Sequence, residues 1–258
     1  MAMGNAHRAV GTSNDTLVLN PAGLTSAARY SIDLAYAHGF EDLPSHYHLS
    51  VVDSKSTPVA GGLGYTVSRQ NGDTNHRVYL GSAYQVAPML SMGSTLKYVH
   101  GIYTDPTGEK ITRDFFTTDL GFIFKPGSAF ALGITLHNIV RSHDNPLSTY
   151  RMGFATSLTL GPVLFAADVV ANGFDFKSKD MTYHGGIEVF LFGLLAIRGG
   201  YIGAWLPQQH NILEISFQNK ITGGVAFVNE IGAIDMAYQQ SINGNLTREL
   251  IATIKFFL

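Results

Sequence analysis

Histidine has the widest catalytic and metal-binding use of the residue types in this chain. None of the ten histidines forms an HExxH spacing or a similar metal pattern. His46 and His48 would share one face of a strand, but no acidic residue accompanies them, so we interpret both as rim residues. There is no GxSxG motif, and the glycine-rich run 61–64 lies within a predicted strand instead of before a helix. The sequence therefore predicts no enzyme, no metal site and no cofactor.

Eight charged residues occupy strand positions that face away from the large apolar side chains. These lumen charges are Lys97, Asp119, Arg151, Asp168, Glu188, Arg198, Asp235 and Lys255. Opposite signs fall on neighbouring strands, and pairing would limit the desolvation cost of charges in a narrow lumen. The predicted pairs are Lys97 with Asp119, Arg151 with Asp168, Glu188 with Arg198, and Asp235 with Lys255. Two interpretations are open. The charges form a structural ion-pair network, or they form a polar constriction or a site for a ligand's carboxylate around Arg151 or Arg198.

The elements that would position these charges are stretches with period-two patterning, each bounded by turn residues. The predicted strands are 28–40, 46–56, 59–69, 76–86, 90–103, 113–125, 128–139, 149–160, 163–174, 182–192, 194–204, 218–229, 232–242 and 246–258. Their length matches the ~9 to 11 residues that cross a bilayer at a tilt. The fold class is therefore all-β, a transmembrane antiparallel barrel of about 14 strands.

Alternation within the strands separates large apolar residues from small or polar ones. In 128–139, Phe130 and Leu132 oppose Ala131 and Gly133. A soluble sandwich would also alternate, but its polar face would be crowded with Lys, Glu and Thr. Here that face is dominated by Gly, Ala, Ser and Thr, which suits a narrow, partly filled lumen.

The predicted connections alternate between short and long. The short ones include 57–58, 161–162 and 230–231, whereas 70–75 and 205–217 are longer. Outer-membrane barrels have short periplasmic turns and longer outer loops. An even number of strands then places both chain ends on the periplasmic side.

The overall composition agrees with a membrane barrel. Charged residues make up 14% of the 258 residues, well under the roughly 25% of ordinary soluble proteins. The net charge is −2 with no basic cluster, so no nucleic-acid partner is expected. No apolar run approaches the ~18 residues of a transmembrane helix, and no signal peptide is evident at the start. We expect a bilayer partner, a bacterial outer-membrane location and a signal peptide already removed.

Residues 1–27 do not share the strand pattern. They are rich in small residues and reach Asn20, Pro21, Ala22 and Gly23, a tetrapeptide suited to a tight turn. We interpret 1–27 as a plug in the lumen and 28–258 as the barrel, which together form one domain.

The segment AMGNAHRAVGTSNDTLVLNPAGL resembles the N-terminal region of the FadL-like outer-membrane proteins, a family that also includes PorV-like barrels. The run 224–227 and the run 234–238 look similar to the family's last hairpin. The resemblance implies a hatch inside a fourteen-stranded barrel, with Asn20, Pro21 and Ala22 matching the hatch motif. That turn is either a fixed lock or a gate that shifts to open a hydrophobic path.

The same resemblance implies two functions. The first is passage of small hydrophobic molecules across the outer membrane. The second is a non-transporting PorV-like role, as a structural or docking subunit bound to other envelope proteins of a secretion or motility complex. The outer loops are shorter than those of FadL-like transporters, so the family's loop-built capture site does not carry over.

Overall fold

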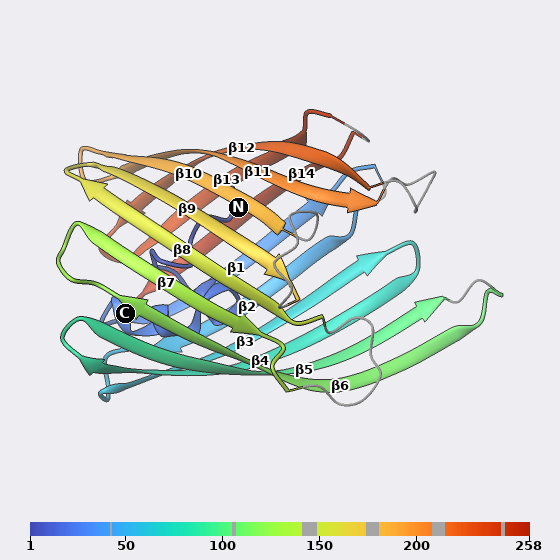
Figure 1. Ribbon diagram of the computed structural model, residues 1–258, viewed down its shortest axis with the longest axis horizontal. Helices are drawn as coiled ribbons and strands as arrows, with labels where there is room; N and C mark the ends of the chain where they lie inside the picture. Colours follow the sequence, from blue (N-terminus) through green and yellow to red (C-terminus); the bar gives the residue numbers. More distant parts are fainter. Residues whose placement is uncertain (42, 105–106, 141–148, 174–180, 208–214, 244–245) are drawn as a thin grey trace.

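The computed structural model is a closed antiparallel barrel (Figure 1). It describes residues 1–41, 43–104, 107–140, 149–173, 181–207, 215–243 and 246–258. Each strand pairs with its sequence neighbours, and β1 closes the ring by pairing with β14. The prediction of a fourteen-stranded barrel is confirmed. The predicted loops 140–148 and 175–181 lie almost wholly outside the described residues. The predicted loop 205–217 is too long, because strand pairing reaches residue 207 and resumes at residue 215, and only 208–214 lie outside the described residues.

Two short helical turns precede the strands. They are α1 (Thr16–Leu19) and η1 (Pro21–Ser26). The strands are β1 (Tyr30–Gly39), β2 (Ser45–Asp53), β3 (Val59–Gln70), β4 (Asp73–Ala87), β5 (Leu90–Thr104), β6 (Lys110–Phe124), β7 (Phe130–His137), β8 (Arg151–Leu160), β9 (Val163–Asn172), β10 (Met181–Leu191), β11 (Leu195–Pro207), β12 (Ile215–Asn229), β13 (Gly232–Ser241) and β14 (Arg248–Phe257). Among the described residues, no helix combines the length and the apolarity needed to cross a membrane.

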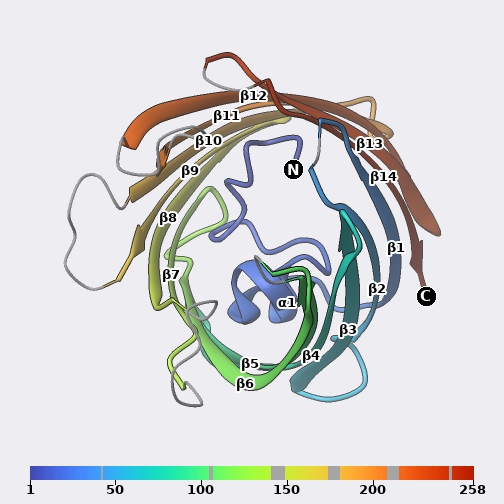
Figure 2. The ribbon, with the colours of Figure 1, turned by 90° about the vertical axis from the view of Figure 1, so that its right-hand side faces the viewer.

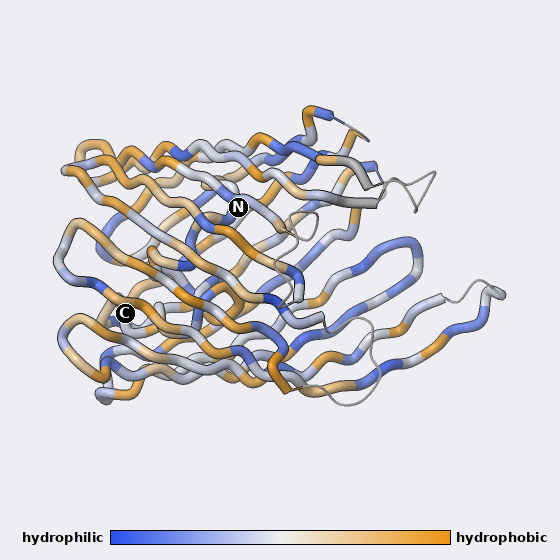
Figure 3. The backbone as a smooth tube through the Cα atoms, in the orientation of Figure 1, coloured by the Kyte–Doolittle hydropathy of each residue, from blue (hydrophilic) through white to orange (hydrophobic). Residues whose placement is uncertain are grey.

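The predicted alternation is present in the strands. In β7, Ala131, Gly133 and Thr135 are buried toward the lumen, whereas Phe130 and Leu132 are exposed on the outer wall. Hydrophilic stretches gather near the tips of the long hairpins β3–β4 and β5–β6 (Figure 3). The outer surface therefore carries an apolar band, and the lumen is lined by small and polar residues.

The predicted loop 70–75 is wrong. Asn71 and Gly72 form a two-residue turn in which both residues have positive φ, 48° and 88°. An Asn-Gly pair adopts this conformation readily, and its twist matches that of the flanking strands. Strand pairing therefore continues to Gln70 and Asp73, which lengthens this hairpin beyond the sequence estimate.

Residues 1–27, called the inner segment below, run through the inside of the ring (Figure 2). Its helical turns pack against β3 to β6, while Met3 and Gly4 lie against β10 to β12. Leu17 and Met3 are both fully buried. The core of the molecule is thus the contact between the inner segment and the inner wall.

Candidate functional site

Glycines in the inner wall make room for the inner segment. A Cβ atom at Gly121 would lie 2.0 Å from Oδ1 of Asn20, and one at Gly93 would lie 2.6 Å from the Ala22 nitrogen. A Cβ at Gly81 would lie 2.5 Å from the Leu17 side chain. Distances this short are steric clashes, so only glycine allows the approach.

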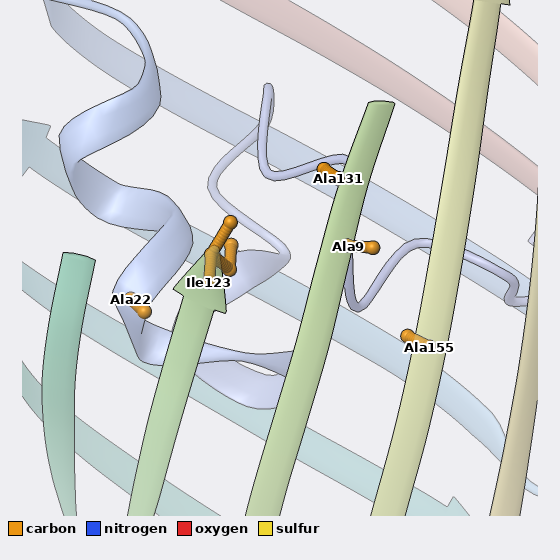
Figure 4. Close-up of a cluster of buried hydrophobic side chains, with 5 residues drawn as sticks. All are labelled: Ala9, Ala22, Ile123, Ala131 and Ala155. Carbon is orange, nitrogen blue, oxygen red and sulfur yellow. The ribbon is translucent and has the colours of Figure 1, made fainter. Parts of the chain in front are cut away.

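The turn around Asn20 is fixed by hydrogen bonds and packing. The Asn20 side-chain amide donates to the carbonyls of Arg8, at 2.6 Å, and Phe122, at 3.3 Å. Its Oδ1 accepts from the Ala22 nitrogen at 3.2 Å, which caps η1. Ala22 packs against Ile123 in the cluster of Figure 4. Asn20, Pro21, Ala22 and Gly23 are all buried, so the structure brings the four predicted residues together at the wall of β4 to β6.

Arg8 of the inner segment holds the buried carboxylate of Asp168. The Arg8 guanidinium lies 3.1 Å from Asp168, and the Arg8 backbone nitrogen also donates to that carboxylate, at 3.2 Å. The predicted pair of Arg151 with Asp168 is wrong. Arg151 stands opposite Asn172 in the strand register, whereas Asp168 is opposite Ala155. The inner segment supplies the cation in place of the neighbouring strand.

Lys97 and Asp119 are paired as the sequence indicates. Their charged atoms are 2.6 Å apart, and the same carboxylate accepts from His137 at 2.8 Å and from the Asn138 backbone at 2.9 Å. Asp119 is buried. Because each oxygen of this carboxylate has donors, the cluster resembles a structural network.

A second cluster lies at the other side of the lumen. The guanidinium of Arg198 bonds Glu188 at 2.5 Å, as predicted, and also pairs with Asp235. The predicted pair of Asp235 with Lys255 is wrong. Lys255 instead donates to Ser13 of the inner segment at 2.7 Å and lies 3.9 Å from Asp33. In the register, Lys255 faces Asp33 across the seam where β14 meets β1.

The inner segment also carries its own ion pair. Nδ1 of His7 lies 3.4 Å from the Asp15 carboxylate. Burial raises the pKa of the Asp15 carboxyl, but the hydrogen bond and charge of His7 outweigh burial and hold this pKa below its usual range.

A cavity of about 570 Å³ opens between the inner segment and the wall. It reaches the short-turn end of the barrel, where Gly161 and Pro162 border it. Alanines from β11 to β13 form much of its wall, including Ala196, Ala226 and Ala233. Arg198, Lys255 and their partners form its polar side. This volume lies in the range of small-molecule sites.

A second pocket, of about 380 Å³, lies on the outer wall over β1 and β2. Its lining is largely apolar and includes Leu34, Leu49 and Ile254. Ala35 and His48, which are partners in the strand register, border both this pocket and the inner cavity. At these two residues the barrel wall therefore has the cavity on one side and the outer pocket on the other.

The expectation that His48 is a rim residue is wrong. His48 points into the lumen, where its Nδ1 lies 2.7 Å from the Thr66 hydroxyl. His46 lies 2.6 Å from the Ser68 hydroxyl on the same strand pair. Among the described residues, no group of three metal-ligating side chains is close enough to hold a metal ion.

Sequence reasoning missed three contacts in the lumen, made by Arg8, Asp33 and His137. Asp33 could have been found, because closure of a barrel pairs the first strand with the last and so brings Asp33 near Lys255. His137 follows the alternation of β7 and faces the lumen. The position of Arg8 depends on the path of the inner segment, and no sequence pattern specifies that path.

The sequence matches no protein-family model and no curated protein. Solved structures share its architecture. The Pseudomonas putida toluene transporter TodX is 13% identical, with a TM-score of 0.75 over 99% of this chain and 96% of TodX. The CymD monoaromatic hydrocarbon channel is 13% identical, with a TM-score of 0.72 over 99% and 95% of the two chains. A Pseudomonas aeruginosa FadL homologue is 10% identical, with a TM-score of 0.65 over 99% and 97%. The protein thus has the fold of a FadL-like barrel.

Proposed function

We propose that this protein is an outer-membrane barrel through which small hydrophobic molecules pass. The observation that carries the proposal is the pair of spaces on either side of the wall at Ala35 and His48. One space is the lumenal cavity, and the other is an apolar pocket on the outer surface. A hydrophobic molecule could cross here between the lumen and the hydrocarbon of the bilayer with little exposure to water.

The outer surface supports a membrane location. Tyrosines on several strands point outward near the long-loop end, and several of their hydroxyls are bonded to polar side chains. Tyr65 lies 2.6 Å from His76 Nδ1, and Tyr98 donates to Asp114 at 2.6 Å. Such amphipathic rings suit the boundary between hydrocarbon and head groups. At the short-turn end, Phe192 in the β10–β11 turn is 96% exposed, which suits the opposite interface.

In this proposal the inner segment is a fixed plug and Asn20 to Gly23 is its lock. The support is the set of short approaches to wall glycines and the bonds of the Asn20 side chain. Moving the turn would break these contacts together. The lumen charges Lys97, Asp119 and Asp168 then serve to hold the plug and the wall, and passage uses the side of the lumen that the plug does not fill.

The proposal is tested by uptake of a fluorescent hydrophobic probe into proteoliposomes that contain the full chain. Ala35→Leu adds bulk at the shared wall and should reduce uptake about tenfold or more. Gly61→Leu is the matched control, because Gly61 lies on the adjacent wall with no atom within 4 Å of an added Cβ. Equal uptake by Ala35→Leu and the unchanged protein would contradict passage at this wall.

A docking role in an envelope complex is the second proposal. The inner segment packs closely against the wall along β3 to β9, which favours this role. A barrel whose lumen is filled on that side suits a protein that does not transport molecules. If proteoliposomes show no uptake above protein-free vesicles and an envelope protein copurifies with the barrel from native membranes, the docking role replaces passage.

A further inference from the structure

The charged side chains that border the lumenal cavity already have partners within the protein. Arg198 holds Glu188 and Asp235, and His7 holds Asp15. Each of these groups therefore has an ion-pair partner without a ligand. Among the described side chains, a fully charged head group deep in the cavity would find no unpaired opposite charge, which is costly away from water.

Arg29, at the edge of the cavity, contacts neutral groups instead of a carboxylate. Its guanidinium donates to the Thr12 carbonyl at 2.7 Å and lies 3.9 Å from the centre of the Phe257 ring. It is thus held by a carbonyl and an aromatic face. The charge pattern of the cavity consequently favours a neutral ligand.

Two buried carboxylate oxygens in the cavity wall, on Asp15 and on Asp33, have no hydrogen-bond donor among the described residues. Asp33 is 5% exposed, and among the described residues its Oδ1 has no donor. Its Oδ2 accepts from Ser13 at 3.4 Å and lies 3.9 Å from the Lys255 ammonium. A buried carboxylate oxygen without a donor is unfavourable. A ligand that brings a hydroxyl group would satisfy this oxygen.

Another part of the cavity wall is apolar. Ala35, Ile251 and Ala237 border it near Asp33, and Leu164, Phe190 and Val228 border it further along. A hydrocarbon chain would fit against this surface and be removed from water.

We propose that the cavity binds neutral hydrophobic alcohols. The ligand hydroxyl would donate to the Asp33 carboxylate and accept from the Lys255 ammonium, while the chain lies along the alanine wall. A carboxylate of the same length would be repelled by Asp33, and an alkane would leave the carboxylate unsatisfied. This assignment rests on the proposed passage of hydrophobic molecules and names the class that the lumen prefers.

The test measures equilibrium binding of radiolabelled decan-1-ol and decanoate to the detergent-solubilised full chain, with protein-free micelles subtracted. Decan-1-ol should bind at least tenfold more tightly than decanoate. Val228→Phe, which adds bulk inside the cavity and leaves Asp33 intact, should weaken decan-1-ol binding about tenfold. Equal affinity for the two probes, or unchanged binding by Val228→Phe, would overturn the assignment.

Asp33→Asn gives a sharper test, because it keeps the shape of the side chain but leaves Lys255 without its carboxylate. Decan-1-ol affinity should fall about tenfold and decanoate affinity should rise, which reverses the preference. Asp114→Asn, the same change on the outer surface, should leave the affinities for both probes unchanged. If the Asp33→Asn variant loses its heat-modifiable gel migration, it has not folded. The Val228→Phe result then decides whether decan-1-ol binds in the cavity.

The two proposals fail separately. Probe uptake that depends on Ala35, together with equal binding of decan-1-ol and decanoate, would leave passage standing and remove the preference for alcohols. Selective decan-1-ol binding without any uptake would keep the site and remove the transport role.

Discussion

Along β3 to β9 the inner segment lies directly on the barrel wall, whereas along β10 to β14 the short-turn end of the wall borders a cavity. We call these the packed half and the hollow half. Small residues line both, glycines such as Gly121 in the first and alanines such as Ala226 in the second. In the packed half an atom of the inner segment lies where a side chain would be at Gly81, Gly93 and Gly121. In the hollow half Met3 and Gly4 reach the wall at Gly186 and Gly200, but nearer the short-turn end a cavity separates the inner segment from the wall.

The difference shows that a small-residue lumen can have two uses. Where the chain returns to fill the space, small residues allow close packing. Where it does not, the same residue types leave volume for a ligand. Substitutions that are severe in one half should therefore be mild in the other, and the predictions below compare the two.

The largest difference is expected at buried charge. Arg8→Met leaves Asp168 buried without a cation and should lower the free energy of unfolding by about 3 to 5 kcal/mol. Arg29→Met, at the edge of the cavity, should cost less than about 1 kcal/mol, because its guanidinium has no close carboxylate. Urea unfolding of the barrel in detergent measures both. Equal losses of unfolding free energy in the two variants would remove the distinction between the packed half and the hollow half.

The next comparison truncates a leucine in each half. Leu17 is fully buried against Gly62 and Gly81, so Leu17→Ala should destabilise by about 2 to 5 kcal/mol. Leu164 is partly buried at the cavity, and Leu164→Ala enlarges a space that already exists. Its cost in the same unfolding assay should be under half that of Leu17→Ala. A larger loss at Leu164 would mean that the cavity is not open in solution.

The third comparison adds one methyl group in each half instead of removing side-chain atoms. Gly121→Ala drives a Cβ into Asn20 and should cost about 1 to 3 kcal/mol. Val228→Ile adds a methyl group beside the cavity and should cost little, which thermal unfolding would show. If Gly121→Ala were as stable as the unchanged protein, the contact between the inner segment and the wall would be loose, and the lock at Asn20 would be doubtful.

The smallest expected effect is on the pH dependence of stability. The lowered pKa of Asp15 means that its charged form stabilises the folded state at pH values above about 4. This contribution is lost as the pH falls through the folded-state pKa. Asp15→Asn should therefore lower the unfolding temperature slightly at pH 5 and have less effect near pH 3. A difference that grows in acid would contradict the role of His7.

The number of strands and the face of each strand could be predicted from the sequence, because alternation is a local property. The partners of the charges could not all be predicted. Lys97 with Asp119 follows from neighbouring strands, but Asp168 takes its cation from Arg8, whose position depends on a non-local path. The cavity was also beyond prediction, since it exists only where the inner segment leaves the wall.

The most direct test of the account asks whether the inner segment moves during passage. The chain contains no cysteine, so an engineered pair is unambiguous. The hydroxyls of Thr25 and Ser91 are 2.8 Å apart, one on the inner segment and one on β5, so a double Thr25→Cys and Ser91→Cys variant should form a disulfide. Hydrophobic probe uptake should be the same in the oxidised and reduced forms, because the plug stays in place. Loss of uptake on oxidation and its return on reduction would instead make the inner segment a moving gate.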